Sequence, residues 1–248
     1  MDYRNISTET LAERWMDQRE VQNLMGRYVN YQLIRREKEL FDRFWCQEHE
    51  PVLGLGNGFY RGREAVEGYY NAVYENTCRR SELMQNLFPD YLGKKSLIEL
   101  HGVGSLYIDA LSGGFVEVAL DGETAKGIWS VMGMDSDIYE YGPYSFWAYG
   151  YIAGDFVKEN GEWKVWHLRM IDDIRCPVGM NWGREWDLSS EEKAEFASLK
   201  GLSLPEPNVP VTIREPFYPG RKNAPLVRVP EPYNTFSETF SYGIEEGE

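Results

Sequence analysis

Four side chains, His101, Tyr28, Tyr31 and Asp172, could together supply acid–base chemistry. The chain has only three histidines, and because His49 falls in a predicted surface loop, His101 is the natural group to change charge near neutral pH. Tyr31 lies one helical turn beyond Tyr28, so the two hydroxyls can point to the same side. An imidazole, a carboxyl and hydroxyls can move the protons of an elimination reaction. The alternative for each is a structural role in the core.

Asp172 ends a predicted strand whose side chains alternate between two faces. An Asp at the end of a strand lined by Trp and Met is partly desolvated, which raises its pKa and suits it to acid or base work. The alternative is an exposed carboxylate beside Asp173. The first face holds Trp166, Leu168, Met170 and Asp172, and the second holds Trp163, Val165, His167 and Arg169. On the second face, we expect His167 to meet a subunit interface or a hydrogen-bond partner.

Aromatic residues are abundant, with 8 Trp, 17 Tyr and 11 Phe making 15% of the chain. Such side chains could form the wall of a site for a flat apolar ligand, although aromatics favour strands and cores in any case. The side chains Trp147, Tyr149 and Tyr151 share one face of a predicted strand and would line either a pocket or a subunit interface. The candidate substrate-binding residues are Trp129, Trp147, Tyr149, Tyr151, Trp166 and Met170.

The charge of the chain argues against two classes of partner. Its 40 acidic residues exceed its 26 basic residues, and the formal charge of -14 repels phosphate backbones and anionic bilayers. No apolar run approaches the roughly 18 residues of a membrane-spanning helix, and the N-terminus does not resemble a signal peptide. We therefore expect a soluble cytoplasmic protein that binds neither nucleic acid nor membrane.

The sequence also predicts no metal and no cofactor. Three scattered cysteines, Cys46, Cys78 and Cys176, lack the spacing of a metal site and fit unreactive thiols in a reducing cytosol. No nucleotide-binding fingerprint is present.

The elements that position these residues follow from two hydrophobic periods. A period typical of helices predicts a long helix from about residue 8 and shorter helices over 37–45 and 63–75, with a short strand over 52–60 between the last two. A period of two predicts strands over 97–109, 115–120, 124–133, 144–158 and 162–174. Asn160-Gly161 between the last two strands is a strong hairpin signal. Helices followed by strands indicate an α+β fold.

The C-terminal part has a different character. A charged helix is expected over 189–199, followed by a proline-rich stretch over 204–232 that is too polar to pack as a domain. We expect this tail to run extended over a surface, such as that of a neighbouring subunit. The predicted division is a domain over 1–187 and a helix and extended tail over 188–248.

Several motifs over residues 10–185 resemble the SnoaL-like branch of the NTF2-like superfamily. They are Gly26-Arg-Tyr28, Tyr60-Arg-Gly-Arg-Glu-Ala-Val66, Asp121-Gly-Glu-Thr-Ala-Lys-Gly-Ile-Trp129 and the final hairpin with Trp163-Lys-Val-Trp-His167. The resemblance implies a cone: a curved, mostly antiparallel sheet wrapped around N-terminal helices, with a pocket inside. The superfamily contains dehydratases, isomerases, cyclases, lyases and proteins without catalysis.

The resemblance also implies where site residues should lie. Dehydratases of this fold, such as the scytalone and bile-acid 7α-dehydratase types, use a Tyr and an Asp of the first helix and a His of the sheet. Tyr28 matches the Tyr, Leu33 stands at the position of the Asp, and His101 lies on the strand that brings the His. Gly133 stands at a second carboxylate position, and Asp172 replaces a last-strand Arg and would face the pocket.

These observations predict a cofactor-independent lyase for a small apolar aromatic alcohol. The composition also resembles that of diarylpropane lyases, which remove water and formaldehyde from a phenolic diol. A non-catalytic binding or assembly protein is the alternative, favoured by Leu33 and Gly133 at the carboxylate positions, and an isomerase or polyketide cyclase is a further one. An aromatic outer sheet face would predict a homo-oligomer, either a dimer or a trimer.

Overall fold

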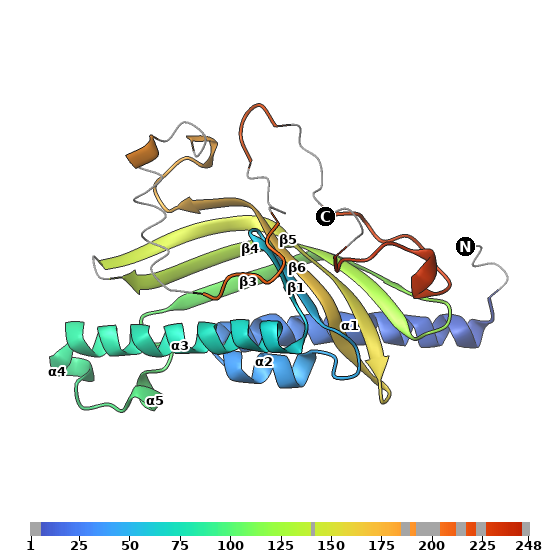
Figure 1. Cartoon of the computed structure of the whole chain (residues 1–248), viewed down its shortest axis with the longest axis horizontal. Helices are drawn as coiled ribbons and strands as arrows, with labels where there is room; N and C mark the ends of the chain where they lie inside the picture. The colour runs from blue at the N-terminus through green and yellow to red at the C-terminus, as the bar shows by residue number, and fades with distance from the viewer. Residues whose placement is uncertain are drawn as a thin grey trace.

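The computed structural model describes residues 6–139, 142–184, 189–191, 204–211, 217–221 and 227–244. Three helices lie along one side of a long curved sheet, and the described C-terminal residues 227–244 lie across its other side (Figure 1). Residues 204–211 instead run beside the sheet, where Val209 pairs with Phe59. Helices precede the long strands along the chain, which confirms the predicted α+β class. The helix predicted over 189–199 falls largely outside the described residues.

The helices that cover the sheet are α1 (Thr8–Leu33), α2 (Glu37–Phe44) and α3 (Arg63–Leu87). The Oγ of Ser7 caps α1 by accepting a hydrogen bond from the Thr10 N–H at 3.1 Å. The helix α3 continues well beyond its predicted end at residue 75, because the chain has no helix-breaking proline before Pro89. No helix within the described residues is long and apolar enough to cross a bilayer.

Six strands form one sheet in the order β2-β1-β6-β5-β4-β3. All neighbouring pairs are antiparallel except β1 with β6, which run parallel. Asn160 and Gly161 have φ values of 52° and 79°, so the turn between the last two strands has the backbone that Asn-Gly predicts. The strands are β1 (Val52–Leu55), β2 (Gly58–Arg61), β3 (Leu106–Val118), β4 (Thr124–Tyr139), β5 (Gly142–Glu159) and β6 (Glu162–Pro177).

The predicted strand over 97–109 is wrong in its first half. The short helices α4 (Pro89–Leu92) and α5 (Leu97–Leu100) follow α3, and Ser96 and Glu99 form a capping box at the start of α5. β3 begins only at Leu106, and it continues through an irregularity between Ser112 and Phe115 to include the predicted strand over 115–120. Because local capping decided the conformation near residue 97, His101 follows a helix and not a strand.

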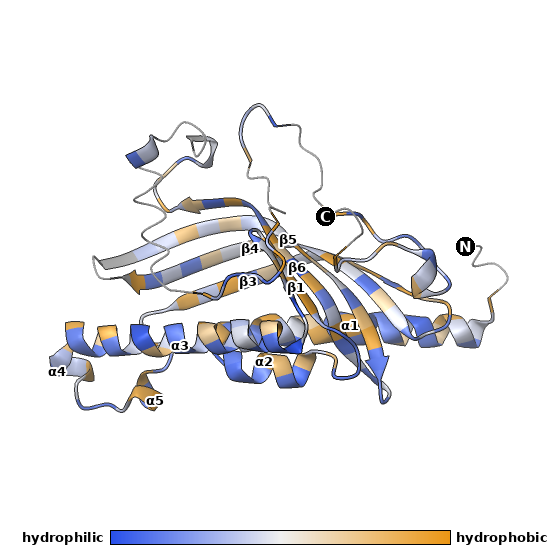
Figure 2. Cartoon of the chain, viewed as in Figure 1, coloured by the Kyte–Doolittle hydropathy of each residue, from blue (hydrophilic) through white to orange (hydrophobic). Residues whose placement is uncertain are grey.

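The main core lies between the helices and the inner side of the sheet, defined as the side that faces α1 and α3. Hydrophobic and hydrophilic residues are interleaved along the strands, as a sheet with two different sides requires (Figure 2). Fully buried side chains of this core include Met25 and Tyr28 of α1, Val66 of α3 and Phe156 of β5. The inner side therefore holds both the core and any interior site.

Two β-bulges in β6 change which of its residues share a side. The ladder pairs Asp155 with His167 but Phe156 with Val165, and it pairs Tyr149 with Ile174 but Gly150 with Asp172. Trp166 and Asp173 are therefore the extra residues. The predicted alternation of this strand is corrected at both points: Trp163 and Val165 join Leu168 in the inner core, whereas Trp166 stacks on His167 with ring centroids 4.4 Å apart.

The outer side of the sheet carries a buried ion pair covered by the C-terminal residues 227–244. Lys126 Nζ lies 2.5 Å from Asp155 Oδ1, both side chains are fully buried, and His167 Nδ1 lies 2.7 Å from Asp155 Oδ2. The Tyr242 N–H donates to the same carboxylate at 2.7 Å, and the Phe236 ring centroid lies 4.4 Å from the ammonium. Residues 227–244 therefore cover the sheet of their own chain. Asp155 is the hydrogen-bond partner of His167, which is one of the two possibilities expected for this side chain.

Candidate functional site

A group of tyrosines, aspartates and one arginine lies between α1, α3 and the inner side of the sheet. Electrostatic interactions connect its members, which approach from two helices and three strands. We call this group the interior polar cluster, and its residues are Tyr28, Tyr69, Tyr70, Tyr107, Asp109, Asp135, Asp172 and Arg175.

Arg175 is the cation of the cluster. Its guanidinium donates a hydrogen bond to Asp135 Oδ2, and Nη1 lies 3.8 Å from Asp172 Oδ2. The Asp172 side chain is 43% exposed and that of Arg175 is 31% exposed, whereas the Asp135 side chain is only 8% exposed. A small molecule in contact with this part of the sheet would therefore meet Asp172 and Arg175 first.

Asp135 has an unused acceptor. Its Oδ1 is buried and has no hydrogen-bond partner among the described residues. Burial raises the pKa of Asp135, and Arg175 offsets this effect only in part. A buried oxygen without a partner is costly, so it marks a place where a hydroxyl of a bound molecule would gain a hydrogen bond.

Asp109 is a second carboxyl group of the cluster whose charge is disfavoured. Burial and the nearby Asp172 and Asp135 raise its pKa to about 6, despite a hydrogen bond from Tyr107 and the charge of Arg175. Like charges around a partly desolvated carboxyl produce this effect. Asp109 is thus poised to gain or lose a proton close to neutral pH.

Asp109 lies directly beside Gly133. Asp109 and Gly133 are paired across β3 and β4, and a Cβ added at Gly133 would lie 3.1 Å from Asp109 Oδ1. The carboxylate of the neighbouring strand therefore lies beside the position where the resemblance implies an acidic residue. Arg175, three residues after Asp172, places an arginine on the same side of the last strand.

The floor beside these groups is made of small residues. Gly133 is paired with Ala148, Ala148 with Arg175, and Gly150 with Asp172. A Cβ at Gly150 would lie 1.9 Å from the Ile171 carbonyl oxygen, so only glycine allows the bulge at this point. The row from Asp109 through Gly133 and Ala148 to Arg175 therefore has no large side chain at its two middle positions.

The tyrosines of the cluster are proton donors at neutral pH. The hydroxyls of Tyr28 and Tyr70 lie 2.5 Å apart. Burial first, and neighbouring tyrosines or carboxylates second, raise the pKa values of Tyr28, Tyr69 and Tyr107 well above the usual range. Each of these hydroxyls is therefore protonated over the whole physiological range.

Two of the four predicted catalytic residues lie in the cluster. Tyr28 is fully buried in α1, and Asp172 faces inward on β6 as the resemblance implied. Tyr31 does not join Tyr28, because its ring packs edge-on against Phe44 at 5.1 Å. The guanidinium of Arg36 lies 4.8 Å from the same ring, on the α2 side of the helix.

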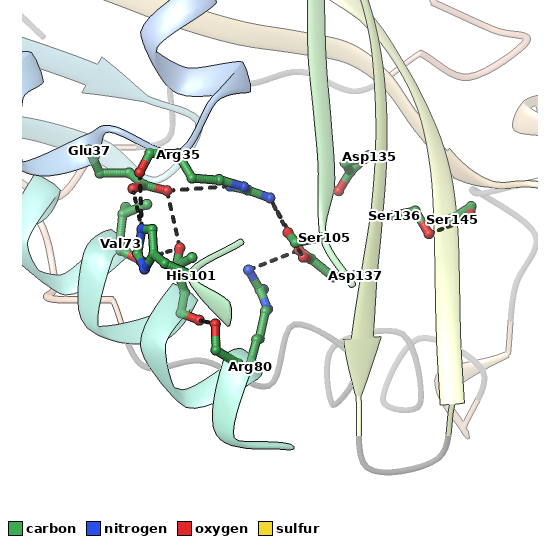
Figure 3. A network of polar contacts seen from close by, with 12 residues as sticks. Arg35, Glu37, Val73, Arg80, His101, Ser105, Asp135, Ser136, Asp137 and Ser145 are labelled. Carbon is green, nitrogen blue, oxygen red and sulfur yellow. Dashed lines mark hydrogen bonds and ion pairs between the residues drawn. The ribbon is translucent and has the colours of Figure 1, made fainter. Parts of the chain in front are cut away.

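His101, the predicted catalytic histidine, lies in a second network (Figure 3). His101 Nε2 lies 3.0 Å from the Arg35 carbonyl oxygen and 3.4 Å from Glu37 Oε2. Arg35 and Arg80 pair with Asp137 of β4 at 3.7 and 2.9 Å. The guanidinium of Arg35 also lies 5.6 Å from the ring centroid of Tyr107, so this network borders the interior polar cluster without placing His101 in it.

The predicted aromatic wall is divided between the two sides of the sheet. Trp129 is buried on the inner side, where Gly114 and Gly127 leave room for its indole, and Met170 packs against the same core. The side chains of Trp147, Tyr149 and Tyr151 lie on the outer side, because they alternate with inward-facing residues such as Ile152. Trp166 also lies away from the cluster, at its bulge. The structure therefore brings only Trp129 and Met170 to the side that holds Asp172.

Sequence reasoning missed most members of the cluster. Asp135 shares a side with Trp129 at a spacing of two, so extending the predicted strand beyond residue 133 would have found it. Arg175 depends on a bulge that the period of two does not predict, and Tyr107 and Asp109 depend on the true start of β3.

Comparison with known proteins supports a single family. The SnoaL-like domain family matches residues 13–169, which include α1, α2, α3 and most of the sheet. No protein in a search of curated sequences matches the chain.

Solved structures resemble the chain at low sequence identity. A single-residue variant of Rv3472, a function unknown protein from Mycobacterium tuberculosis, is 15% identical, with a TM-score of 0.46 over 77% of this chain and 90% of that one. A hexachlorocyclohexane dehydrochlorinase, LinA-type3 from Novosphingobium barchaimii LL02, is 17% identical, with a TM-score of 0.47 over 68% and 96%. A proposed scytalone dehydratase from Novosphingobium aromaticivorans is 14% identical, with a TM-score of 0.46 over 69% and 99%.

The family match covers well over half of the chain, and the helices packed against a curved six-stranded sheet form the NTF2-like cone that the motifs implied. The chain belongs to the SnoaL-like domain family.

Proposed function

We propose that the protein is a cofactor-independent lyase that removes water from a small aromatic alcohol at the interior polar cluster. The observation that carries this proposal is Asp109, a carboxyl with a pKa of about 6 beside protonated tyrosine hydroxyls. An elimination needs a base and an acid within reach of one substrate, and this pair of residue types provides both.

The proton transfers assign a role to each group. At neutral pH Asp109 is mainly ionised and accepts a proton from the substrate carbon, whose electrons form the new double bond. The hydroxyl on the neighbouring carbon leaves as water with the proton of Tyr107. The Tyr107 hydroxyl is hydrogen-bonded to Asp109, so transfer of the captured proton from Asp109 to Tyr107 restores both groups.

The same groups would serve a diol that also loses formaldehyde. Asp109 would then take the proton of the terminal hydroxyl, the carbon–carbon bond would break, and its electrons would form the double bond as water leaves. Formaldehyde takes the terminal carbon and oxygen. Which proton is removed decides between the two reactions, and the substrate sets that choice.

Substrate binding would use the side chains around Asp109 and Tyr107. Arg175 and Asp172 are the most exposed charged groups of the cluster, and the free Oδ1 of Asp135 offers an acceptor for a substrate hydroxyl. Met170 and Leu111 are partly exposed apolar side chains on the same side of the sheet. A flat ring over the small floor at Gly133 and Ala148, with its hydroxyl toward the aspartates, satisfies both kinds of contact.

The test is ultraviolet difference spectroscopy of the purified protein against phenolic diols, hydroxylated steroids and polyketide-like enols, with formaldehyde assayed in parallel. New conjugation without formaldehyde indicates a dehydratase, and conjugation with formaldehyde indicates the deformylating reaction. Spectral shifts on binding without product would contradict a lyase and favour a non-catalytic binding protein, which Leu33 in place of the helix Asp also favours.

A further inference from the structure

A cysteine, a histidine and a glutamate form a row of contacts outside the interior polar cluster. Cys78 of α3 places its Sγ 3.8 Å from Nδ1 of His101. The opposite ring nitrogen, Nε2, lies 3.4 Å from Oε2 of Glu37 and 3.0 Å from the Arg35 carbonyl oxygen. The order thiol, imidazole, carboxylate is that of a nucleophile, its base and a group that orients the base.

The hydrogen bonds of His101 fix which nitrogen carries the proton. Both partners of Nε2, the Arg35 carbonyl and the Glu37 carboxylate, can only accept, so Nε2 holds the hydrogen and donates it. Nδ1 of the neutral ring then has a free lone pair, and this lone pair faces the thiol of Cys78. Glu37 is buried and would stabilise the imidazolium that forms when the thiol gives up its proton.

We propose that Cys78 is a nucleophilic thiol that exchanges with low-molecular-weight disulfides, with His101 as its base and Glu37 as the positioning residue. The Cys78 thiolate attacks one sulfur of the disulfide and forms a mixed disulfide. The other sulfur leaves as a thiolate and takes up a proton. One S–S bond forms as another breaks, so the exchange needs no further oxidant or reductant.

The three cysteines differ in what surrounds them. Cys78 is partly exposed, whereas Cys46 and Cys176 are buried. Burial and the charge of Glu159 raise the pKa of Cys46 to about 12, which leaves that thiol protonated and inert. The two buried cysteines are therefore internal controls for the reactivity of Cys78.

Other side chains lie around the thiol and its partners. Tyr74 lies one turn earlier in α3, and a hydrogen bond to Cys78 is the first cause that raises the pKa of its hydroxyl. Lys38 of α2 lies 4.2 Å from the Tyr74 ring centroid, and Arg35 lies 3.7 Å from Glu37. Thr77 donates a hydrogen bond to Glu37 at 3.1 Å, which holds the carboxylate in place.

The experiment measures the rate of modification at each cysteine by peptide mass spectrometry, with iodoacetamide and with oxidised glutathione as probes at pH 7 and pH 9.5. We expect Cys78 of the folded wild-type protein to react at pH 7 at least about tenfold faster than a free cysteine derivative. His101→Gln should lower the rate at pH 7 by about tenfold, because it removes the base that accepts the thiol proton. It should leave the rate at pH 9.5 nearly unchanged, because at this pH the solution ionises the thiol without the histidine.

His49→Gln is the matched control, since His49 is likewise paired with a glutamate, Glu159 of β5, whereas the histidine beside Cys78 is His101. It should leave the rate at Cys78 unchanged. If Cys78 of the wild-type protein reacts no faster at pH 7 than the free derivative, the proposal is overturned without any variant. Equal loss of rate at both pH values in His101→Gln would also overturn it, because this result shows a change of exposure only.

Discussion

Asp172 and Arg175 point to the same side of β6 because a β-bulge at Asp173 lies between them. In a regular strand residues three apart face opposite sides, and Arg175 would then lie on the outer side with no contact to Asp135. The bulge requires Gly150 on the neighbouring strand, where any side chain would collide with the Ile171 carbonyl. A backbone irregularity thus assembles the charged half of the interior polar cluster.

This arrangement makes Asp172 and Asp173 a matched pair of neighbouring carboxylates on opposite sides of the sheet. Asp172→Asn should lower kcat/KM for the substrate by ten- to a hundredfold, because it removes a charge next to Arg175 on the inner side. Asp173 faces the outer side and lies 3.3 Å from Arg221, so Asp173→Asn should lower the free energy of unfolding but leave kcat/KM unchanged. Steady-state kinetics and urea unfolding of both variants test the assignment, and an equal loss of kcat/KM in the two would refute it.

Gly133 should be required for the position of Asp109. A methyl group at this position would lie 3.1 Å from Asp109 Oδ1 and 3.0 Å from Ala148 Cβ, so the carboxylate would have to move. Gly133→Ala should therefore lower kcat/KM by roughly tenfold or more, as expected for a displaced catalytic group. Gly68→Ala in α3, where nothing lies within 4 Å of an added Cβ, should retain full activity. Full activity in Gly133→Ala would show that Asp109 does not need this space.

The raised pKa of Asp109 predicts a pH dependence of stability with a defined sign. In the unfolded chain this carboxyl ionises near its usual pKa of 3.8, and in the folded protein near 6. Between these values the unfolded state loses its proton first, so the contribution of Asp109 lowers the free energy of unfolding as pH rises, by about 3 kcal/mol in total. Asp109→Asn should remove this slope between pH 4 and about 6 and should be more stable than wild type at pH 7. Urea unfolding at a series of pH values measures both effects.

The buried ion pair under the C-terminal residues predicts a strong effect on stability. Asp155→Asn leaves the fully buried ammonium of Lys126 without its counterion, which should lower the free energy of unfolding by about 3–5 kcal/mol. Glu162→Gln, at a pair with a 74% exposed carboxylate, should cost less than about 1 kcal/mol in the same urea experiment. Similar losses in the two variants would contradict the structural role of the Lys126–Asp155 pair.

The same pair should weaken in acid. Burial raises the pKa of Asp155, but His167 and Lys126 lower it by more, so the net pKa lies below its usual value. The stabilisation is therefore present at neutral pH and is lost as pH falls through the lowered pKa.

The fold was predictable from local patterns, whereas the grouping of residues in the candidate site was predictable only in part. Hydrophobic periods and the Asn160-Gly161 turn identified the long helices and the final hairpin, because each of these signals is contained within one element. Tyr28 and Asp172 were found in the same way, on a helix and a strand whose direction the resemblance supplied.

The other members of the cluster depend on features that the sequence periods do not contain. The bulge at Asp173 reverses the side of Arg175, and the capping box at Ser96 converts the expected start of a strand into a helix and moves His101 to a loop. Asp109 lies beside Gly133 because the two residues are paired across β3 and β4, and this pairing is set by the register of the two strands. Contacts of this kind arise only when the whole sheet is assembled.

The role of Asp109 as the base is tested by the pH dependence of kcat/KM for wild type and Asp109→Asn, on the compound from the panel that gives new conjugation. Wild-type kcat/KM should rise with pH through about 6, where Asp109 ionises, and Asp109→Asn should lose about a hundredfold or more of kcat/KM together with this rise. Substrate affinity should remain measurable in the variant. An Asp109→Asn protein that keeps wild-type kcat/KM and the same rise near pH 6 would contradict the assignment of Asp109 as the base.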